Sequence, residues 1–196
     1  MCKDIKNSNM LTLTRGGKKF LYAIEIWPMN FNGCICLDVG CSTGGVSSVL
    51  VSKGVCQVYA VDCGKNQIMY SLRVNRHIKL FEGRSIQSIP KGSFLKALSI
   101  IIVDVSFTRI SAVFLSILLH VRHYSFFYIL VKPQYECKRQ DLGLYGILKS
   151  NERRTIVLFD VLKYIEALNV KILGITISPL LERMKNVEYL IYAFKC

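Results

Sequence analysis

The chain has little histidine, and its cysteines are not spaced as metal ligands. Three histidines occur in 196 residues, and none of the eight cysteines forms a C-x-x-C pair. Structural zinc sites use Cys and His ligands at short, regular spacings, so no metal is expected here. Most of the thiols fall in or beside apolar runs, where free cysteine behaves as a small hydrophobe; these are Cys34, Cys36, Cys41, Cys56 and Cys63. Reduced thiols of this kind indicate a cytoplasmic setting.

The chain also lacks a long apolar run. Its longest apolar stretches, residues 112–119 and 126–131, fall short of the roughly 20 residues that a membrane-spanning helix needs. Residues 1–7 have no apolar core of the kind that a signal peptide requires. Neither export nor a membrane partner is therefore expected.

Acidic residues are scarce relative to basic ones. The 13 Asp and Glu residues stand against 26 Lys and Arg, which gives a formal net charge of +13 at pH 7. An enzyme that acts on a small neutral metabolite does not need such a positive electrostatic field, so we expect a polyanionic partner. A general enrichment of lysine by an AT-rich genome is the alternative explanation. The length, with 52% hydrophobic residues, suits one domain and is too short for two.

The most informative segment is residues 35–45, in which an apolar strand is expected to end in an acid and a glycine-rich turn. Such a turn lets the backbone approach a ligand, and the helix after it offers free N–H groups to a carboxylate or phosphate. Asp38 would repel a phosphate but suits a cation, so the pattern favours a ligand with both charges, such as S-adenosylmethionine. Asp62 ends the next apolar strand, where its carboxylate can accept ribose hydroxyls. A dinucleotide site would need G-x-G-x-x-G, which is missing; a purely structural turn is the remaining alternative.

Apolar, strand-like runs alternate with helical patterns, which predicts an α/β, Rossmann-like fold with helices on both faces of a mostly parallel, seven-stranded sheet. The short connector 178–186 cannot hold a crossover helix, so the last two strands are expected to form a hairpin, with one strand antiparallel. We expect a polar tail over 1–13 and a single domain over 14–196. The expected strands are 34–37, 58–61, 78–81, 98–103, 126–131, 170–177 and 187–194, and the expected helices are 17–28, 45–53, 67–73, 110–121 and 152–168. Residues 132–150 are expected to form a long loop, a candidate lid.

Four polar residues are candidates for chemistry, although each has a structural alternative. Asp104 ends the strand at 100–103, but it could instead cap the next helix, a role also open to Ser106. Lys132 follows an apolar strand, where burial would favour a neutral amine, but it could equally extend its head to solvent. Lys19 by itself is one cation on a solvated helix face, and Glu188 alone is more typical of a cross-strand ion pair.

Together these residues lie in motifs that resemble the TlyA family, a branch of the FtsJ-like RNA 2′-O-methyltransferases whose members are also named hemolysins. The resemblance runs from about Thr14 to Phe194, and its matching segments are 14–19, 37–45, 59–64, 103–107, 131–136 and 186–190. It implies that the family's Lys-Asp-Lys-Glu tetrad corresponds to Lys19, Asp104, Lys132 and Glu188.

The resemblance implies methyl transfer from S-adenosylmethionine to the ribose 2′-hydroxyl of ribosomal RNA, free or in ribosomal subunits, typically at cytidine. Lys132 would be the general base, with the two acids orienting the lysines and the target ribose. The implied cofactor-binding residues are Asp38, Gly40, Ser42, Thr43, Gly44, Gly45, Asp62, Ser85 and Asp104. The expected RNA-binding residues are Arg15, Lys18, Phe107, Tyr135, Lys138, Arg139 and Lys185, with other exposed cations and Tyr145 as weaker candidates.

The chain departs from the family pattern at several positions. Only residues 1–13 precede the Arg-Gly-Gly motif, where family members usually carry a small RNA-binding domain. The glycine-rich lid is altered at 144–146, Lys185 replaces a glycine, and Ser85 replaces an asparagine. Base methylation is disfavoured because Asp-Val-Ser-Phe stands where amine methyltransferases have an Asn/Asp-Pro-Pro-aromatic turn. A non-catalytic RNA-binding or ribosome-assembly protein that keeps the fold is the alternative function.

Overall fold

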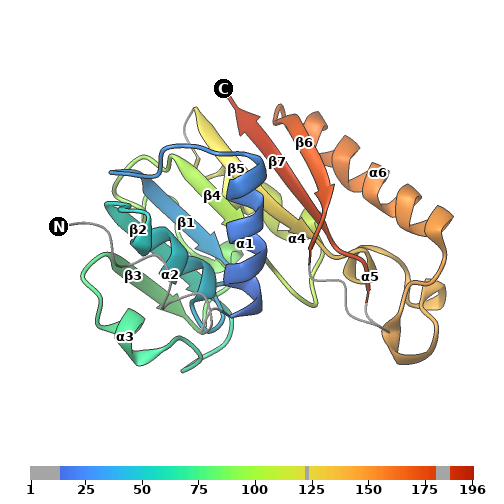
Figure 1. The fold of residues 1–196 in the computed structure, drawn as a ribbon, viewed down its shortest axis with the longest axis horizontal. Helices are drawn as coiled ribbons and strands as arrows, with labels where there is room; N and C mark the ends of the chain where they lie inside the picture. Colours follow the sequence, from blue (N-terminus) through green and yellow to red (C-terminus); the bar gives the residue numbers. More distant parts are fainter. Residues whose placement is uncertain (1–13, 122–123, 180–185) are drawn as a thin grey trace.

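A computed structural model describes residues 14–121, 124–179 and 186–196, and these form one seven-stranded sheet with helices on both faces (Figure 1). The strand order is β3-β2-β1-β4-β5-β7-β6. The strands are β1 (Ile35–Val39), β2 (Gln57–Asp62), β3 (Ile78–Glu82), β4 (Ile100–Val103), β5 (Ser125–Val131), β6 (Lys171–Ile177) and β7 (Tyr189–Lys195). The main helices are α1 (Arg15–Ile26), α2 (Gly45–Ser52), α3 (Tyr70–Arg73), α4 (Ile110–Leu118), α5 (Pro133–Glu136) and α6 (Asn151–Ala167).

Strands β1 to β5 pair in parallel, whereas β7 runs antiparallel to both of its neighbours, β5 and β6. This arrangement confirms the expected fold and the C-terminal hairpin. Every residue of β4 is buried, as expected for a strand covered on both faces. The β5–β7 register ends with Val131 opposite Tyr189, so the start of β7 lies at the same sheet edge as the end of β5.

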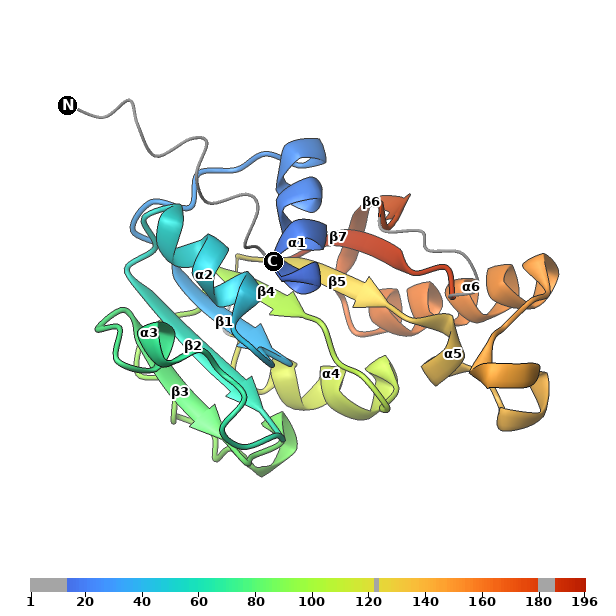
Figure 2. The ribbon, with the colours of Figure 1, turned by 60° about the horizontal axis from the view of Figure 1, so that its bottom comes forward.

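The two helical layers bury separate apolar clusters. Helices α1 and α2 cover one face through Phe20, Ala23 and Leu50, among others. Helices α4 and α6 cover the opposite face, where Phe114 and Ile165 belong to the second cluster. Figure 2 shows α1 and α2 above the strands and α4 below them. No helix in the described part of the chain is long and apolar enough to cross a membrane.

Two expected segments differ from the structure. The helix predicted over 67–73 is only the short α3, because the N–H groups of Gln67 and Ile68 donate to Glu82 Oε1 at 3.1 and 3.4 Å, outside any helix. The segment 132–150 is not one open loop. It begins with α5, for which Pro133 supplies the preferred first helical residue, and continues in two 3-10 turns. The predicted tail over 1–13 lies outside the described residues.

The N-termini of α1 and α2 pack directly against each other. Thr14 caps α1 by accepting the Gly17 N–H at 3.4 Å. A Cβ added to Gly45, the first residue of α2, would lie 1.7 Å from Thr14 Oγ1. Only glycine therefore allows this approach, which sets the position of α1 over the sheet edge.

We expect Gly45→Ala to lower the free energy of unfolding by about 1–3 kcal/mol, because its methyl group would push α1 away from α2. The matched control is Gly143→Ala, where the nearest atom to an added Cβ is 3.5 Å away, and which we expect to change stability by less than about 0.5 kcal/mol. Urea denaturation measures both values. Equal stabilities for the two variants would contradict the packing argument.

Candidate active site

A cavity of about 550 Å³ opens where β1, β2 and β4 end. Small-molecule sites commonly have volumes of about 300–1,000 Å³. Its wall includes six residues that the sequence singled out: Gly40, Ser42, Asp62, Ser85, Asp104 and Phe107. A ligand site at the carboxyl edge of the central parallel strands is the usual place in open α/β folds.

Gly40 brings the turn after β1 against the end of β4. Its φ is +88°, and a Cβ there would lie 2.3 Å from the carbonyl oxygen of Asp104. Any side chain at this position would separate the turn from β4, so the motif's first glycine fixes the shape of the cavity wall.

Asp62 anchors the turn and faces the same cavity. Its Oδ2 accepts the Ser42 N–H at 2.8 Å, and its Oδ1 accepts the Gly64 N–H at 2.7 Å. A carboxylate oxygen has two lone pairs, so each oxygen keeps acceptor capacity for a ligand hydroxyl.

The remaining residues of the glycine-rich segment lie behind this wall. Asp38 is fully buried under α2 and accepts the Ser47 hydroxyl at 2.6 Å, while its Oδ1 has no hydrogen-bond partner among the described residues. Gly44, at φ +88°, is the N-cap of α2 and lies against Ile68 and Leu72, and Gly45 faces Thr14. Thr43 is exposed, and its carbonyl accepts the Met69 N–H. These four predicted binding residues, Asp38, Thr43, Gly44 and Gly45, shape the turn and are not part of the cavity wall.

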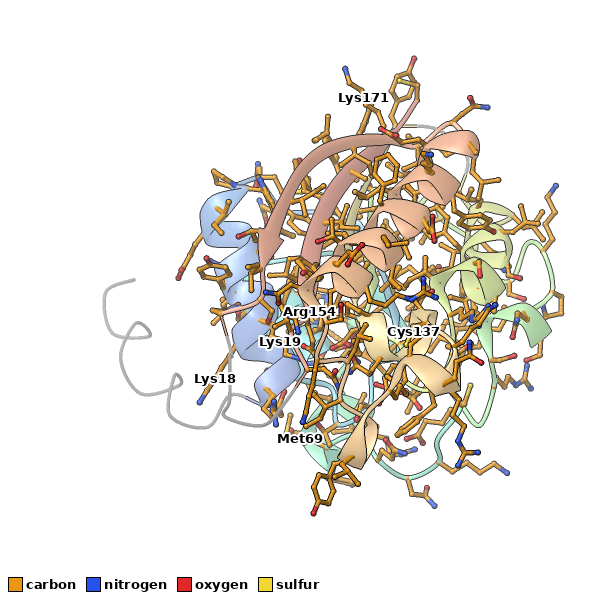
Figure 3. The ribbon with its side chains drawn as sticks, turned by 90° about the vertical axis from the view of Figure 1, so that its right-hand side faces the viewer. Lys18, Lys19, Met69, Cys137, Arg154 and Lys171 are labelled. Carbon is orange, nitrogen blue, oxygen red and sulfur yellow. The ribbon has the colours of Figure 1, made fainter. Side chains whose placement is uncertain are left out.

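The Lys-Asp-Lys-Glu residues form two ion pairs. Lys132 Nζ lies 2.7 Å from Asp104 Oδ1, at the ends of neighbouring strands, and Lys19 Nζ pairs with Glu188 Oε2 just before β7. The side chains of Lys19 and Lys132 are only 9% and 10% exposed. Figure 3 shows Lys19 on the inner side of α1 and Lys18 pointing away from it.

The two ion pairs meet at a small void. Lys19 and Asp104 both line a cavity of about 20 Å³ between α1 and the sheet. That volume suits a single water molecule. The structure therefore brings the two ion pairs together around this void. Each lysine has a carboxylate partner of its own.

The contacts at the start of α4 test whether Asp104 or Ser106 caps this helix. The first N–H of α4, from Ile110, is accepted by Glu136 Oε1 at 2.8 Å, so neither Asp104 nor Ser106 caps this helix. Burial raises the pKa of Glu136, and the hydrogen bond from Ile110 opposes this shift. Ser106 Oγ instead accepts from Lys132 Nζ at 2.7 Å.

The polar residues of the cavity wall that the sequence analysis missed are Gln67, Gln87, Ser106 and Thr108. Gln67 accepts the Ser42 hydroxyl at 3.3 Å, and no pattern in the sequence marks it. Ser106 was considered only as a helix cap, although its position two residues after Asp104 was a usable signal, because strand ends gather at this edge.

The predicted RNA-binding aromatics lie at the mouth of the site. Phe107 is 88% exposed at φ +61°, and its ring centroid is 5.0 Å from that of Tyr135. Arg15, Lys18, Lys138 and Arg139 are exposed, whereas Lys185 lies outside the described residues. Two of the weaker candidate cations are already paired, Arg73 with Glu82 and Arg153 with Asp141. No group of residues able to hold a metal occurs in the described ranges.

Burial gives Asp38 an unusual titration. Desolvation raises its pKa to about 7, and the Ser47 hydrogen bond only partly opposes this shift. The folded state thus binds the Asp38 proton more tightly than the unfolded state does. The corresponding stability is fully present at low pH and is lost as the pH rises through about 7.

Without ligand, the free energy of unfolding of the wild type should fall between pH 5 and pH 8 as Asp38 loses its proton. In Asp38→Asn we expect this fall to be smaller, by on the order of 2 kcal/mol. Urea denaturation at the two pH values measures this difference. The control is Asp160→Asn on the exposed side of α6, which should keep the wild-type pH dependence. Identical pH dependence in wild type and Asp38→Asn would be evidence against a buried, proton-binding Asp38.

Comparison with known proteins agrees with this geometry. The model of the FtsJ-like methyltransferase family matches residues 12–195. "Hemolysin A" of Brachyspira hyodysenteriae is 33% identical over 193 residues, which cover 96% of this chain and 80% of that protein. The "16S/23S rRNA (cytidine-2'-O)-methyltransferase TlyA" of Mycobacterium tuberculosis is 27% identical. The match covers 96% of this chain and 70% of that protein.

Solved structures show the same relationship. The structure described as "a putative hemolysin from Lactococcus lactis" superposes with a TM-score of 0.88 at 29% identity, and the match covers 93% of this chain and 88% of that chain. Fibrillarin of Aeropyrum pernix, at a TM-score of 0.66 and 15% identity, shares the fold over 90% of this chain and 76% of its own. The sequence-based expectation of a methyltransferase with S-adenosylmethionine as cofactor is confirmed, and the chain belongs to the FtsJ-like methyltransferase family.

Proposed function

We propose that this protein methylates the ribose 2′-hydroxyl of cytidine in ribosomal RNA, with Lys132 as the general base. The observation that carries the proposal is the meeting of two lysine–carboxylate pairs beside the cofactor cavity. The names of the TlyA relatives support the substrate, and the net charge of +13 suits a polyanionic partner.

The residues around the cavity suit S-adenosylmethionine. Asp62 would accept ribose hydroxyls, and Ser85 lies on the wall toward which the base would extend. The carboxylates of Asp62 and Asp104 on the wall give this end of the site an acidic character that favours an ammonium and a sulfonium group.

The protein's task is to position a ribose hydroxyl and remove its proton. Bound S-adenosylmethionine supplies an electrophilic methyl group, so a new O–C bond forms, the S–C electron pair stays on sulfur, and the hydroxyl proton must leave. Lys132 takes up that proton at Nζ, and Asp104 offsets the resulting positive charge. Glu188 holds Lys19 at the opposite side of the site, where Lys19 can contact the target ribose or its phosphate. Alignment at about 3–3.5 Å supplies much of the rate.

The aromatic pair at the mouth suits an unstacked base. Phe107 presents an almost fully exposed ring beside Tyr135, and sequence-specific RNA recognition commonly stacks extruded bases on such rings. The exposed cations Arg15, Lys18, Lys138 and Arg139 would contact flanking phosphates.

We expect Lys132→Ala to reduce transfer of labelled methyl groups from S-adenosylmethionine to unmethylated ribosomal RNA by about 10²- to 10⁴-fold, because no other base replaces the amine. Cofactor affinity, measured by calorimetry, should stay within a few-fold of wild type, since Lys132 is not part of the cavity wall. Lys163→Ala on α6 is the matched control and should keep full activity. Full activity in Lys132→Ala would exclude the mechanism, and an inactive wild type that still binds RNA would favour the non-catalytic alternative.

We expect Phe107→Ala to raise the KM for RNA by about 5- to 100-fold, the loss that corresponds to one base–aromatic stack. Phe107→Trp should retain near wild-type KM, because an indole provides the same stacking surface. Steady-state kinetics with a short RNA measures the effect. A normal KM in Phe107→Ala would show that the exposed ring does not hold the base.

A further inference from the structure

We propose that Ser106 is a positioning residue that fixes the direction of the Lys132 amine, an inference that rests on the proposed function. Lys132 Nζ lies 2.7 Å from Ser106 Oγ and 2.7 Å from Asp104 Oδ1. Ser106 and Asp104 both belong to the wall of the cofactor cavity. The amine is therefore held by a hydrogen bond to Ser106 and by an ion pair with Asp104, whose Oδ1 lacks hydrogen-bond geometry, at the rim of the site where the methyl group must be transferred.

The hydrogen bond to Ser106 gives the amine a direction that the ion pair with Asp104 does not. A neutral amine has two N–H bonds and one lone pair in a tetrahedral arrangement. When Ser106 accepts one N–H, rotation about the Cε–Nζ bond is restricted and the lone pair is limited to the remaining tetrahedral directions. With Asp104 alone, the amine could rotate about its Cε–Nζ bond, and the lone pair would have no preferred direction.

A hydroxyl suits this second position better than a carboxylate. It accepts an N–H without adding negative charge, so it orients the amine but does not hold Lys132 as an ammonium ion as strongly as a second acid would. In the proposed step the ribose hydroxyl proton moves to the Nζ lone pair, which becomes the third N–H bond. One of the other two N–H bonds stays with Ser106, the ion pair with Asp104 offsets the charge, and the proton later leaves to solvent.

Other roles for the Ser106 hydroxyl are accounted for by different residues. Glu136 caps α4, and Gly40 is the residue that brings the turn after β1 against the end of β4. Lys132 is the hydrogen-bond partner of the Ser106 hydroxyl in the described part of the chain. The Lys132 side chain is only 10% exposed, so its stem is held by packing while Ser106 directs its end.

The kinetic test compares Ser106→Ala with Ser106→Thr, which restores the hydroxyl. We expect Ser106→Ala to lower kcat about tenfold with little change in the KM for either substrate. The pH of half-maximal kcat should move downward, because removing an acceptor disfavours the ammonium form more than the amine. Ser106→Thr should recover most of both effects. Ser111→Ala is the control, since its exposed side chain makes no hydrogen bond among the described residues.

A second measurement needs neither cofactor nor RNA. NMR of protein labelled at lysine Cε and Nζ, with the Lys132 signal assigned through Lys132→Gln, follows its titration directly. We expect Ser106→Ala to shift this titration and Ser111→Ala to leave it unchanged. An unshifted titration and an unaltered kcat profile in Ser106→Ala would overturn the inference. If the wild type does not methylate RNA, the proposed function fails, while the NMR comparison still decides whether Ser106 controls the amine.

Discussion

The ion pair between Lys132 and Asp104 is the interaction on which the site depends. Both residues follow directly from neighbouring parallel strands, so the sheet itself delivers an amine and a carboxylate to one edge. Burying such a pair costs desolvation free energy that the attraction between the charges only partly offsets. A hydrophobic pair would serve stability as well, so the arrangement is better explained by chemistry than by folding.

The ion pair between Lys19 and Glu188 reaches the same sheet edge through two departures from regular α/β architecture. Because β7 is antiparallel, its first residue rather than its last lies at the carboxyl edge, and this brings Glu188 to the site. Lys19 arrives on α1, which precedes the first strand and is held close to α2 by the absence of a side chain at Gly45. The site thus requires a reversed strand, a leading helix and a close helix contact, in addition to the glycine-rich turn.

Most of the fold, and part of the site, could be predicted from the sequence. Apolar runs located every strand, and the positions of Asp62, Asp104 and Lys132 at strand ends indicated one edge. Lys19 and Glu188 are different, because nothing local distinguishes them from surface charges, and only the family resemblance joined them. The direction of the Asp38 side chain was not predicted: β-strand alternation turns this strand-end carboxylate under α2, where the Ser47 hydroxyl donates to it, and its role in binding the cofactor stays a prediction. The contact of Ser106 with Lys132 depends on loop geometry, which the sequence pattern does not specify.

We propose that an oxygen on the ribose, and not an atom of the base, receives the methyl group. The most direct measurement is mass spectrometry of nucleosides from ribosomal RNA that lacks the modification, before and after incubation with the protein and S-adenosylmethionine. We expect a new 2′-O-methylcytidine whose added mass remains with the ribose on fragmentation. A methyl group that stays with the base fragment would contradict it.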